Sequence, residues 1–554
     1  MTHPAEFAVF GVLMTAILGL GLFFAFRRKL PLTVDEMFLG SRTLQMVPLA
    51  LSVLATIVSS TGIISFTAHF YAYGMNMVWS LVTYLTMIPV TVHLIIPVLY
   101  RLKVTSIFEY LRARYGSKIS FTACIIYFFL TESGGAAGIA AAAMAISTIF
   151  HVSFIWCCLA IGLTGTVYTA LGGLRGVVWT DCAQAVVSIL APLVIIAKIS
   201  YDSNSGHVTL RPVSSTPPSR FFINARIDFT QDENLWACLI GLSSMVLYRV
   251  GIDQMLVQRY LASRTLKDAQ RTARVGTSLV TAFYFLLLLM AFSIIYWFRD
   301  CDPQLAGAIR HVDQILPFYV KRRLSEFPGF SGLFLAGVVS ATTSTISSMI
   351  NSQAAVLYID VVSQFITITD AEATRVTKCL AFAVGSLMTL YSLAIPYMGS
   401  ATRIVMMVYS ATTGPFVGLF LMALIFPCVN SKGAGTATLL MVIYQLWHLY
   451  ETLRFGVRPE RMPVTVDYCP GNISVPMQAM NQSTTESSYQ SRDAFIIFKL
   501  SSYWSGLLST VITMLLGVLI SVLTGKLKTY KKKLHLTSDV CLRFWRRTGL
   551  IPAE

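Results

Sequence analysis

The chain of 554 residues is 55% hydrophobic and only 12% charged, with a mean hydropathy of +0.67. These values exclude a soluble globular protein and predict an all-α polytopic membrane protein. The net charge of +16 is interpreted as basic cytoplasmic loops, so no nucleic-acid partner is expected.

Apolar runs of about 20 residues recur from end to end, and they predict 13 transmembrane helices with an extracellular N-terminus and a cytoplasmic C-terminus. The predicted spans are 5–26, 46–70, 77–100, 120–149, 153–171, 177–199, 236–257, 276–298, 332–363, 379–397, 402–427, 435–452 and 502–524. Basic residues follow the first run and do not precede it, which indicates a retained span and not a cleaved signal. The segment 258–274, with Arg259 and four further basic residues, is assigned to the cytoplasm.

Two polar segments, 200–235 and 456–498, are predicted to be extracellular loops. The second contains sequons at Asn472 and Asn481, which predict glycosylation. Cys301 and Cys469 both fall in predicted extracellular loops, where the sequence allows a disulfide between them but does not require one.

The stretch 332–352 is long enough to cross a bilayer, yet its second half is rich in hydroxyl side chains. Ala341, Ser344 and Thr345 stand at i, i+3 and i+4, so they share one helix face. A single hydroxyl there is explained by a hydrogen bond to its own helix or to a neighbouring helix. The row as a whole is better explained as neutral oxygen ligands for a small hard cation.

Polar interruptions occur at corresponding places in two groups of five spans. The first is Ser59–Gly62, and the second is the group Gly241, Ser243 and Ser244. Helices broken near the middle of the membrane, one in each of two inverted repeats, are typical of transporters. The expected organisation is a first span and loop (1–45), a first repeat (46–199), an extracellular loop (200–235), a second repeat (236–429), two last spans (430–525) and a basic cytoplasmic tail (526–554).

An interruption after Val58 would free the carbonyl oxygens of Ala55 and Val58 from their helix. With the carbonyl of Ala341 and the hydroxyls of Ser344 and Thr345, they make five neutral ligands for a monovalent cation. Because this set contains no carboxylate, the ion is bound weakly enough to be released.

Acidic residues near or within spans have two interpretations each. Asp181, with Gln184 at i+3, is either a helix-start aspartate favoured by the helix dipole or part of a second cation or gating site. Glu132 is a functional candidate if it lies deep in its span and structural if it lies near one end. Asp253 has the same two interpretations as Asp181, of which the structural one is favoured. The chain has no P-loop, HExxH or GxSxG motif, so an enzyme has no support from motifs.

Four stretches resemble signatures of the sodium/solute symporter family, in the order in which that family carries them. They are YTALGGLRG (168–176), DQMLVQRYLASRTLKDAQ (253–270), GLFLAGVVSATTSTISSMINS (332–352) and GPFVGLFLMALIFPCVNSKGAG (414–435). The first departs from the pattern at Gly176, where Ser, Ala or Pro is more usual. FPGFSGLFLAG, STISS and NSKGA resemble the branch of sodium-dependent multivitamin, monocarboxylate and iodide transporters more than the sugar branch.

The resemblance implies the leucine-transporter type of fold, with two inverted five-helix repeats, and Na+-coupled uptake by alternating access. It places the main sodium site at Ala55, Val58, Ala341, Ser344 and Thr345, and the family's acidic residue at Asp181, with Gln184 beside it. The substrate is expected between the broken centres of two spans, near Ser59, Ser60, Thr61, Ser243, Ser244 and Tyr248. Arg249, close to that region, is not expected from the resemblance.

The resulting hypothesis is a plasma-membrane symporter that imports a small organic anion or vitamin-like solute, such as a monocarboxylate, biotin, pantothenate or iodide, together with Na+. The sequence leaves open a sodium-gated sensor or leak on the same fold, and proton coupling through Glu132. A membrane-embedded enzyme is disfavoured. The substrate, the sodium stoichiometry and the oligomeric state are not determined by the sequence.

Overall fold

A computed structural model describes residues 3–26, 33–204, 221–298, 300–366, 368–397, 401–455, 460–467, 469, 499–524 and 533–549. Within these residues every regular element is a helix, apart from one isolated bridge between Leu44 and Ser263. The longest are α1 (Pro4–Phe26), α8 (Ser117–Phe150), α9 (Phe154–Asn204), α12 (Leu266–Phe298), α14 (Phe330–Val356), α15 (Asp370–Ser392), α16 (Ala401–Ile425), α17 (Ser431–Phe455) and α19 (Ser502–Thr524). The all-helical prediction is therefore confirmed.

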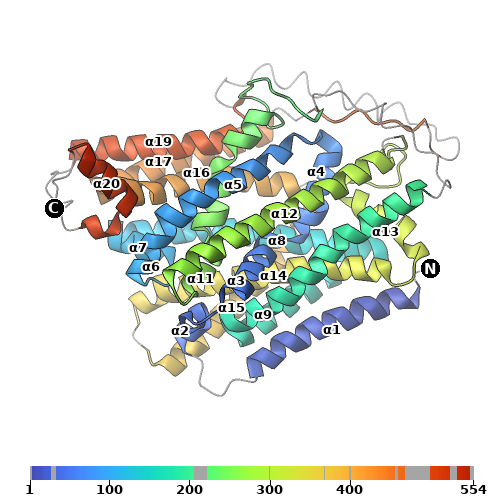
Figure 1. Ribbon diagram of the computed structural model, residues 1–554, viewed down its shortest axis with the longest axis horizontal. Coiled ribbons are helices and arrows are strands. Elements are labelled where there is room, and N and C mark those ends of the chain that lie inside the picture. The colour runs from blue at the N-terminus through green and yellow to red at the C-terminus, as the bar shows by residue number, and fades with distance from the viewer. Residues whose placement is uncertain are drawn as a thin grey trace.

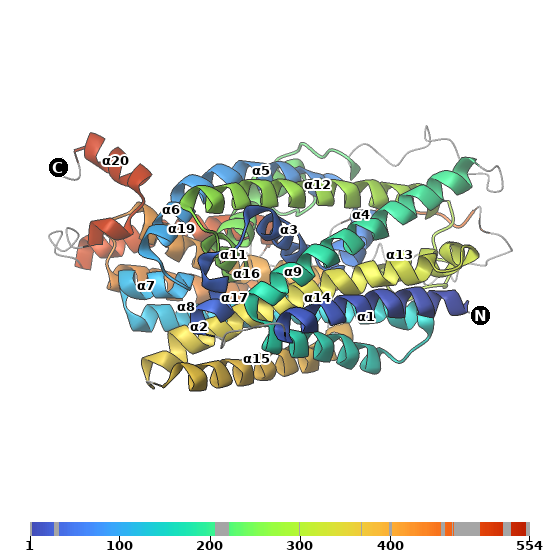
Figure 2. The ribbon, with the colours of Figure 1, turned by 60° about the horizontal axis from the view of Figure 1, so that its bottom comes forward.

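The long helices run roughly along one axis and form several layers (Figures 1 and 2). α1 begins at one end of the bundle, and the short helix α20 (Asp539–Arg547) lies at the opposite end (Figure 1). The start of α1 and the helix α20 thus lie at opposite ends of the bundle, which is the arrangement that an odd number of spans requires.

Nine described helices are long and apolar enough to cross a membrane, or ten when the bent pair Met46–Ile57 and Thr61–Tyr73 counts as one broken span. α9 counts once, although Gly173 (φ 58°, ψ −176°) interrupts it between the predicted spans 153–171 and 177–199. A positive φ favours glycine at that position. The protein is a multi-pass helical membrane protein, and the number of 13 spans stays a prediction.

The helix α14 is the most deeply buried of the candidate spans, whereas α1 is the most exposed. α14 packs against α1, α8, α9 and α15. Small residues let the neighbours approach closely: a Cβ atom on Gly337 would lie 2.7 Å from the Cβ of Ala191 on α9. α14 is therefore the inner helix around which the other layers are arranged.

A carboxylate forms hydrogen bonds at each end of α14. Glu6 on α1 accepts hydrogen bonds from the N–H groups of Gly329 (3.1 Å) and Gly332 (2.6 Å), at the start of α14. An acidic group there satisfies free N–H groups and the helix dipole. In the π-helical turn that follows α14 (η11, Leu357–Val361), Asp360 accepts hydrogen bonds from the Ser106 hydroxyl and, at 3.0 Å, from Arg112. Both ends are thereby tied to other parts of the protein.

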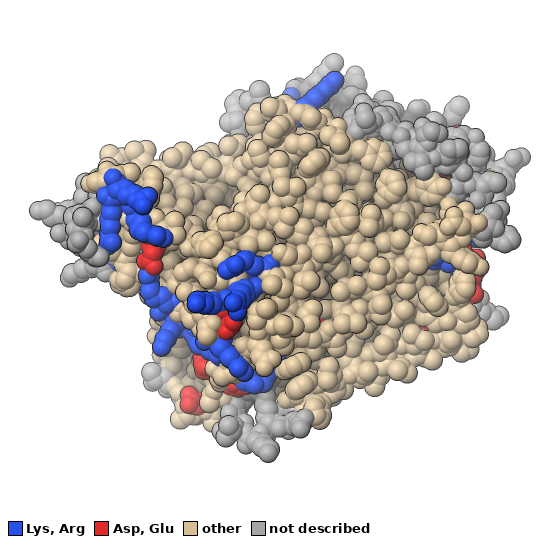
Figure 3. Space-filling model, in the orientation of Figure 1, with Lys and Arg blue, Asp and Glu red and all other residues tan. Residues whose placement is uncertain are grey.

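The two ends of the bundle differ in chemistry. Lys and Arg side chains gather at the end where α20 lies (Figure 3). Cys301 follows α12 directly and forms a disulfide with Cys469, 168 residues away. The sequence allowed this pairing, and the structure forms it. The sequons Asn472 and Asn481 lie outside the described residues.

Candidate functional site

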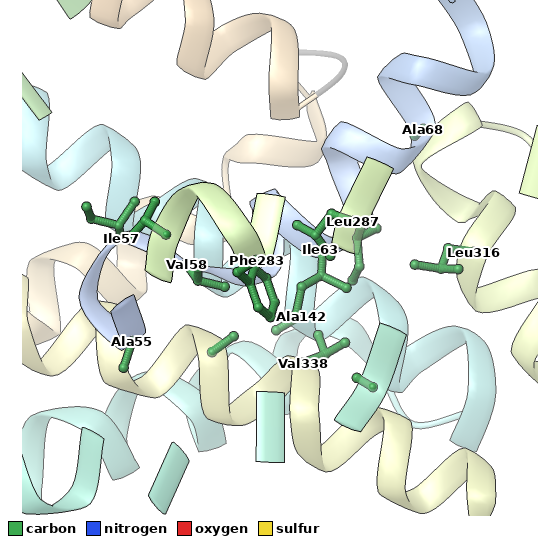
Figure 4. Packing of buried hydrophobic residues seen from close by; sticks show 14 of the residues in the cluster. Ala55, Ile57, Val58, Ile63, Ala68, Ala142, Phe283, Leu287, Leu316 and Val338 are labelled. Carbon is green, nitrogen blue, oxygen red and sulfur yellow. The ribbon is translucent and has the colours of Figure 1, made fainter. Parts of the chain in front are cut away.

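The second predicted span is broken at its centre. α3 (Met46–Ile57) ends at Val58, whose backbone is extended (φ −79°, ψ 118°). The chain then continues through a π-helical turn (η2, Thr61–Ser65) into α4 (Phe66–Tyr73), with a bend of 57° between the two halves. Figure 4 shows Ala55, Ile57 and Val58 on one side of the break and Ile63 beyond it, with Val338 of α14 nearby.

Hydroxyl groups of α14 meet the carbonyl oxygens that the break exposes. The Ser344 hydroxyl lies 2.8 Å from the Ala55 oxygen and 3.0 Å from the Ala341 oxygen. The Thr345 hydroxyl lies 3.0 Å from the oxygens of Val58 and of Ala341, and 3.1 Å from the oxygen of Thr56. All five predicted sodium ligands therefore form one cluster, and the Thr56 carbonyl is a sixth oxygen that the sequence did not single out.

This oxygen cluster contains no charged group. The hydroxyl protons of Ser344 and Thr345 point at carbonyl oxygens. Rotation of each hydroxyl about its C–O bond would turn the proton away, so that the hydroxyl and carbonyl oxygens could all face a bound ion. A hard monovalent cation prefers such a shell of neutral oxygens. The chemistry of the donor set thus fits Na+.

A fully buried ion pair lies one helical turn from the cluster. Arg259 and Asp181, both 0% exposed, are joined at 2.8 Å. Arg259 also donates to the Ser52 hydroxyl (2.6 Å), the Met255 carbonyl (2.7 Å) and the Ser348 hydroxyl (2.5 Å). The prediction that Arg259 belongs to a cytoplasmic basic segment is therefore wrong for this residue, since its partners lie on α3, α9 and α14 inside the bundle.

Ser348 connects the ion pair to the oxygen cluster. Its hydroxyl donates to the Ser344 carbonyl (2.8 Å) and lies 3.1 Å from the Thr56 hydroxyl. Arg259 is thus linked through one side chain to the residues that line the break in span 2.

Gln184 and Asp181 are close to α14, as a second cation or gating site requires. The Gln184 amide donates to the Thr343 hydroxyl at 2.9 Å. Asp181 Oδ1 and Gln184 Oε1 are buried and have no hydrogen-bond partner within the described part of the chain. Two oxygens are thus free for a further ligand, and the second-site role stays a prediction.

The predicted substrate residues are not all gathered in one place. Ser59 and Thr61 hydrogen-bond to each other, and Ser60 donates to the Gly138 carbonyl (2.7 Å). Ser244 is paired with Thr510 of α19 at 2.5 Å.

The break in the seventh predicted span also lies further along the chain than expected. Ser243 and Ser244 are helical (α10, Ser243–Leu247), and a π-helical turn (η8, Tyr248–Ile252) follows. The extended residue is Asp253 (φ −61°, ψ 121°), which caps α11 (Gln254–Leu261). Tyr248 is buried against the rings of Tyr409 and Phe416.

Two ionisable side chains lie deep in the bundle near these breaks. Arg249 on η8 is paired with Asp253 at 2.9 Å. Glu132 on α8 is 5% exposed, and neither of its carboxylate oxygens has a hydrogen-bond partner among the described residues; Gln353 is its polar neighbour. The sequence analysis left proton coupling through Glu132 open and gave Arg249 no role.

Comparisons with known proteins agree with this geometry. The family described as "Sodium:solute symporter family" matches residues 37–440. The human sodium-coupled monocarboxylate transporter 2 is 28% identical over 98% of this chain and 88% of its own length. A putative sodium-dependent multivitamin transporter of Drosophila melanogaster is 27% identical over 94% of this chain and 87% of its own.

Among solved structures, a Na+-coupled sialic acid symporter in a substrate-bound outward-open state has a TM-score of 0.73. It is 20% identical, over 94% of this chain and 98% of its own. The nucleobase-cation-symport-1 family transporter MHP1 has a TM-score of 0.54 at 12% identity, over 90% of this chain and 98% of its own. These likenesses establish the leucine-transporter type of fold.

Proposed function

The chain belongs to the sodium:solute symporter family, and from that premise we propose that it imports a small organic anion together with Na+ by alternating access. The observation that carries the proposal is the meeting of α14 hydroxyls with the carbonyl oxygens at the break in span 2. The relatives named as monocarboxylate and multivitamin transporters support the anion class. Because those relatives are transporters, transport is favoured over catalysis.

In this proposal Na+ is a transported ion that binds in the oxygen cluster. Ala55, Val58 and Ala341 offer carbonyl oxygens, and Ser344 and Thr345 offer hydroxyl oxygens. An ion held by both helices ties the end of α3 to α14 and orders the broken span. If the substrate binds at the same break, the two ligands raise each other's affinity, because the coupling is reciprocal.

The driving force depends on charge. One positive charge crossing about 100 mV gains about 2.3 kcal/mol, and a tenfold sodium gradient adds about 1.4 kcal/mol. A monovalent anion that moves with one Na+ cancels the electrical part, so the gradient alone supports about tenfold accumulation. Larger accumulation requires a second Na+, for which Asp181 Oδ1 and Gln184 Oε1 are the unpartnered oxygens.

We assign the end with gathered basic side chains to the cytoplasm, following the positive-inside tendency. The end at which α1 begins is then extracellular, as is the Cys301–Cys469 disulfide. An oxidising compartment suits that bond. The proposed location is the plasma membrane, with the N-terminus outside and the C-terminus inside.

The double variant Ser344→Ala/Thr345→Ala tests the sodium site. It removes two of the five proposed ligands, so the sodium concentration for half-maximal uptake is expected to rise at least tenfold, or uptake is lost. Ser347→Ala is the matched control, because its hydroxyl donates to the Ser344 carbonyl of its own helix at 2.9 Å and is not one of the proposed ligands. Unchanged sodium dependence in the double variant, at normal surface expression, rejects the site.

Two further measurements separate the alternatives. Accumulation of labelled solute above the external concentration distinguishes a symporter from a sensor or a leak. Replacement of Na+ by choline at fixed pH, in the wild type and in Glu132→Gln, distinguishes sodium coupling from proton coupling. Uptake that persists in choline and disappears in Glu132→Gln contradicts the proposed sodium coupling.

A further inference from the structure

Arg249 lies where the two broken spans meet. Besides its bond to Asp253, it donates to the carbonyl of Ile57, the last residue of α3, at 3.4 Å. Within the described residues only two of its five N–H groups have acceptors. Its side chain is nonetheless 12% exposed. A guanidinium with free donors and access to space inside a membrane protein is a functional candidate.

Three tyrosines from three different helices surround this guanidinium. Tyr84, Tyr284 and Tyr409 all lie close enough to interact with Arg249 electrostatically. The rings of Tyr84 and Tyr284 pack against each other, with their centroids 5.6 Å apart. The Tyr409 hydroxyl has room because position 134 is glycine: a Cβ there would lie 2.8 Å from it. Three tyrosines and a cation thus lie within electrostatic range of one another.

An apolar recess leads to the same tyrosines. It contains about 560 Å³ of empty space, part of which is open to the outside. The recess is lined by Phe66, Phe70, Met77, Val78, Ser80, Leu81, Tyr84, Leu242, Met245, Val246, Tyr284, Leu287 and Leu288. Tyr84 and Tyr284 belong both to this wall and to the surroundings of Arg249. Two of the tyrosines near Arg249 therefore also line an apolar compartment.

We propose that Arg249 binds the carboxylate of the transported anion, with the tyrosine hydroxyls beside it, and that the apolar recess receives the rest of the molecule. The inference rests on the proposed function and narrows its substrate class to monocarboxylates with an alkyl or aryl body. A guanidinium matches a carboxylate through two parallel N–H···O bonds. The recess has almost no polar group to hold a sugar or a second charge.

Asp253 has other partners while the guanidinium holds an anion. It accepts the Met255 N–H at 3.1 Å as the cap of α11, and the Tyr127 hydroxyl at 3.4 Å. A carboxylate that reaches Arg249 therefore shares the guanidinium with Asp253 without leaving Asp253 unpaired. Arg249 donates to the end of α3, next to Val58 of the oxygen cluster, so the anion and Na+ would bind one residue apart along the break.

The test uses the full-length protein in a cell that permits current recording. Labelled butyrate is the probe, and its uncharged amide, butyramide, is the matched competitor. The variants are Arg249→Lys and the neutral pair Arg249→Gln/Asp253→Asn, which avoids a lone buried carboxylate. Arg271→Gln/Asp268→Asn, an exposed pair on α12 with a separation of 4.0 Å, is the control. Sodium-dependent transient currents without anion report whether each variant is folded and binds sodium.

In the wild type, butyrate is expected to compete at least tenfold better than butyramide. Its affinity is expected to rise along the series from acetate to hexanoate by up to about fourfold per CH₂ group. The neutral pair is expected to lose butyrate uptake and the preference over butyramide while keeping its sodium currents. Arg249→Lys, which keeps the charge without the planar fork, is expected to lie between.

Equal competition by butyramide in the wild type, or butyrate affinity within twofold of wild type in the neutral pair, overturns the inference. Sodium-driven uptake of an uncharged solute alone overturns it as well and leaves sodium coupling standing. Absence of any sodium-dependent uptake or current in the wild type overturns the proposed function itself.

Discussion

Two arginines on the same broken span, Arg249 and Arg259, each pair with an aspartate, but the two pairs have very different surroundings. Arg259 and Asp181 are 0% exposed, and Arg259 donates to four protein acceptors. Arg249 reaches two acceptors, is 12% exposed and borders tyrosines that line a recess. The Arg259–Asp181 pair, called the sealed pair below, has no exposed surface and fixes helices in position. The Arg249–Asp253 pair, called the open pair below, has unused N–H donors and some exposed surface, so it is able to bind a ligand. The comparison assigns structure to the first pair and recognition to the second.

The largest expected effect follows from Arg259→Met. It leaves Asp181 as an uncompensated buried charge and removes a donor from Ser52 and Ser348, which is expected to cost about 3–5 kcal/mol of stability. Thermal unfolding of purified protein and surface expression measure the loss. Arg271→Met is the exposed control, expected to cost at most about 1 kcal/mol. An Arg259→Met variant as stable as this control contradicts the structural role of the sealed pair.

A smaller effect is expected from Ser348→Ala. The change removes one acceptor of Arg259 and one donor to the Ser344 carbonyl, and a buried group that loses its partner costs about 1–3 kcal/mol. Because Ser348 connects the sealed pair to the oxygen cluster, the sodium dependence of uptake is expected to shift too. Ser363→Ala, whose hydroxyl bonds within its own turn at 2.7 Å, is the control. If Ser348→Ala lowers stability but leaves the sodium dependence of uptake unchanged, the ion pair of Arg259 and the oxygen cluster are not coupled through Ser348.

For the open pair, Arg249 and Asp253, we expect substitution to reduce transport activity but to change stability little. Arg249→Gln/Asp253→Asn replaces both ions by neutral amides, so no lone charge is left buried, and buried ion pairs are often replaced at little cost. We expect a change of about 1 kcal/mol or less in stability, together with loss of butyrate uptake. A melting temperature that falls as far as in Arg259→Met shows instead that both pairs are structural.

The smallest effect is expected at a third ion pair, Lys198 with Glu326, which lies outside the comparison. Lys198 lies 2.7 Å from Glu326, and this contact holds the pKa of Glu326 below its usual range. A lowered pKa stabilises the fold above the ordinary pKa of a glutamate, and the gain is lost as the pH falls through the lowered value. Because Glu326 is 47% exposed, Glu326→Gln is expected to cost less than about 1 kcal/mol at pH 7. Unfolding curves of wild type and variant are expected to converge in acid; a constant difference contradicts the assignment.

The sequence predicted the oxygen cluster because its parts follow local rules. Ser344 and Thr345 share a helix face, and the polar interruption after Val58 marks where carbonyls become free. It misplaced Arg259 because a count of basic residues cannot see Asp181, which is 78 positions away in the chain. The break at Asp253 was missed since Gly and Ser were taken as the signal, whereas a π-helical turn and a capping aspartate produce it. The recess depends on the packing of four spans, which no local pattern encodes.

The anchoring of α14 has a consequence for movement. Glu6 holds its first turn and Asp360 holds the turn after its end, and close contacts with α9 cover its flank. A helix whose two ends are both hydrogen-bonded to other helices is held in place. In the proposed alternating-access cycle, we therefore expect α3, α4 and α10 to move relative to α14, while α14 itself does not bend. Among the described residues, the α14 hydroxyls that contact the end of α3 belong to Ser344, Thr345 and Ser348, so we expect these contacts to break and re-form in each cycle.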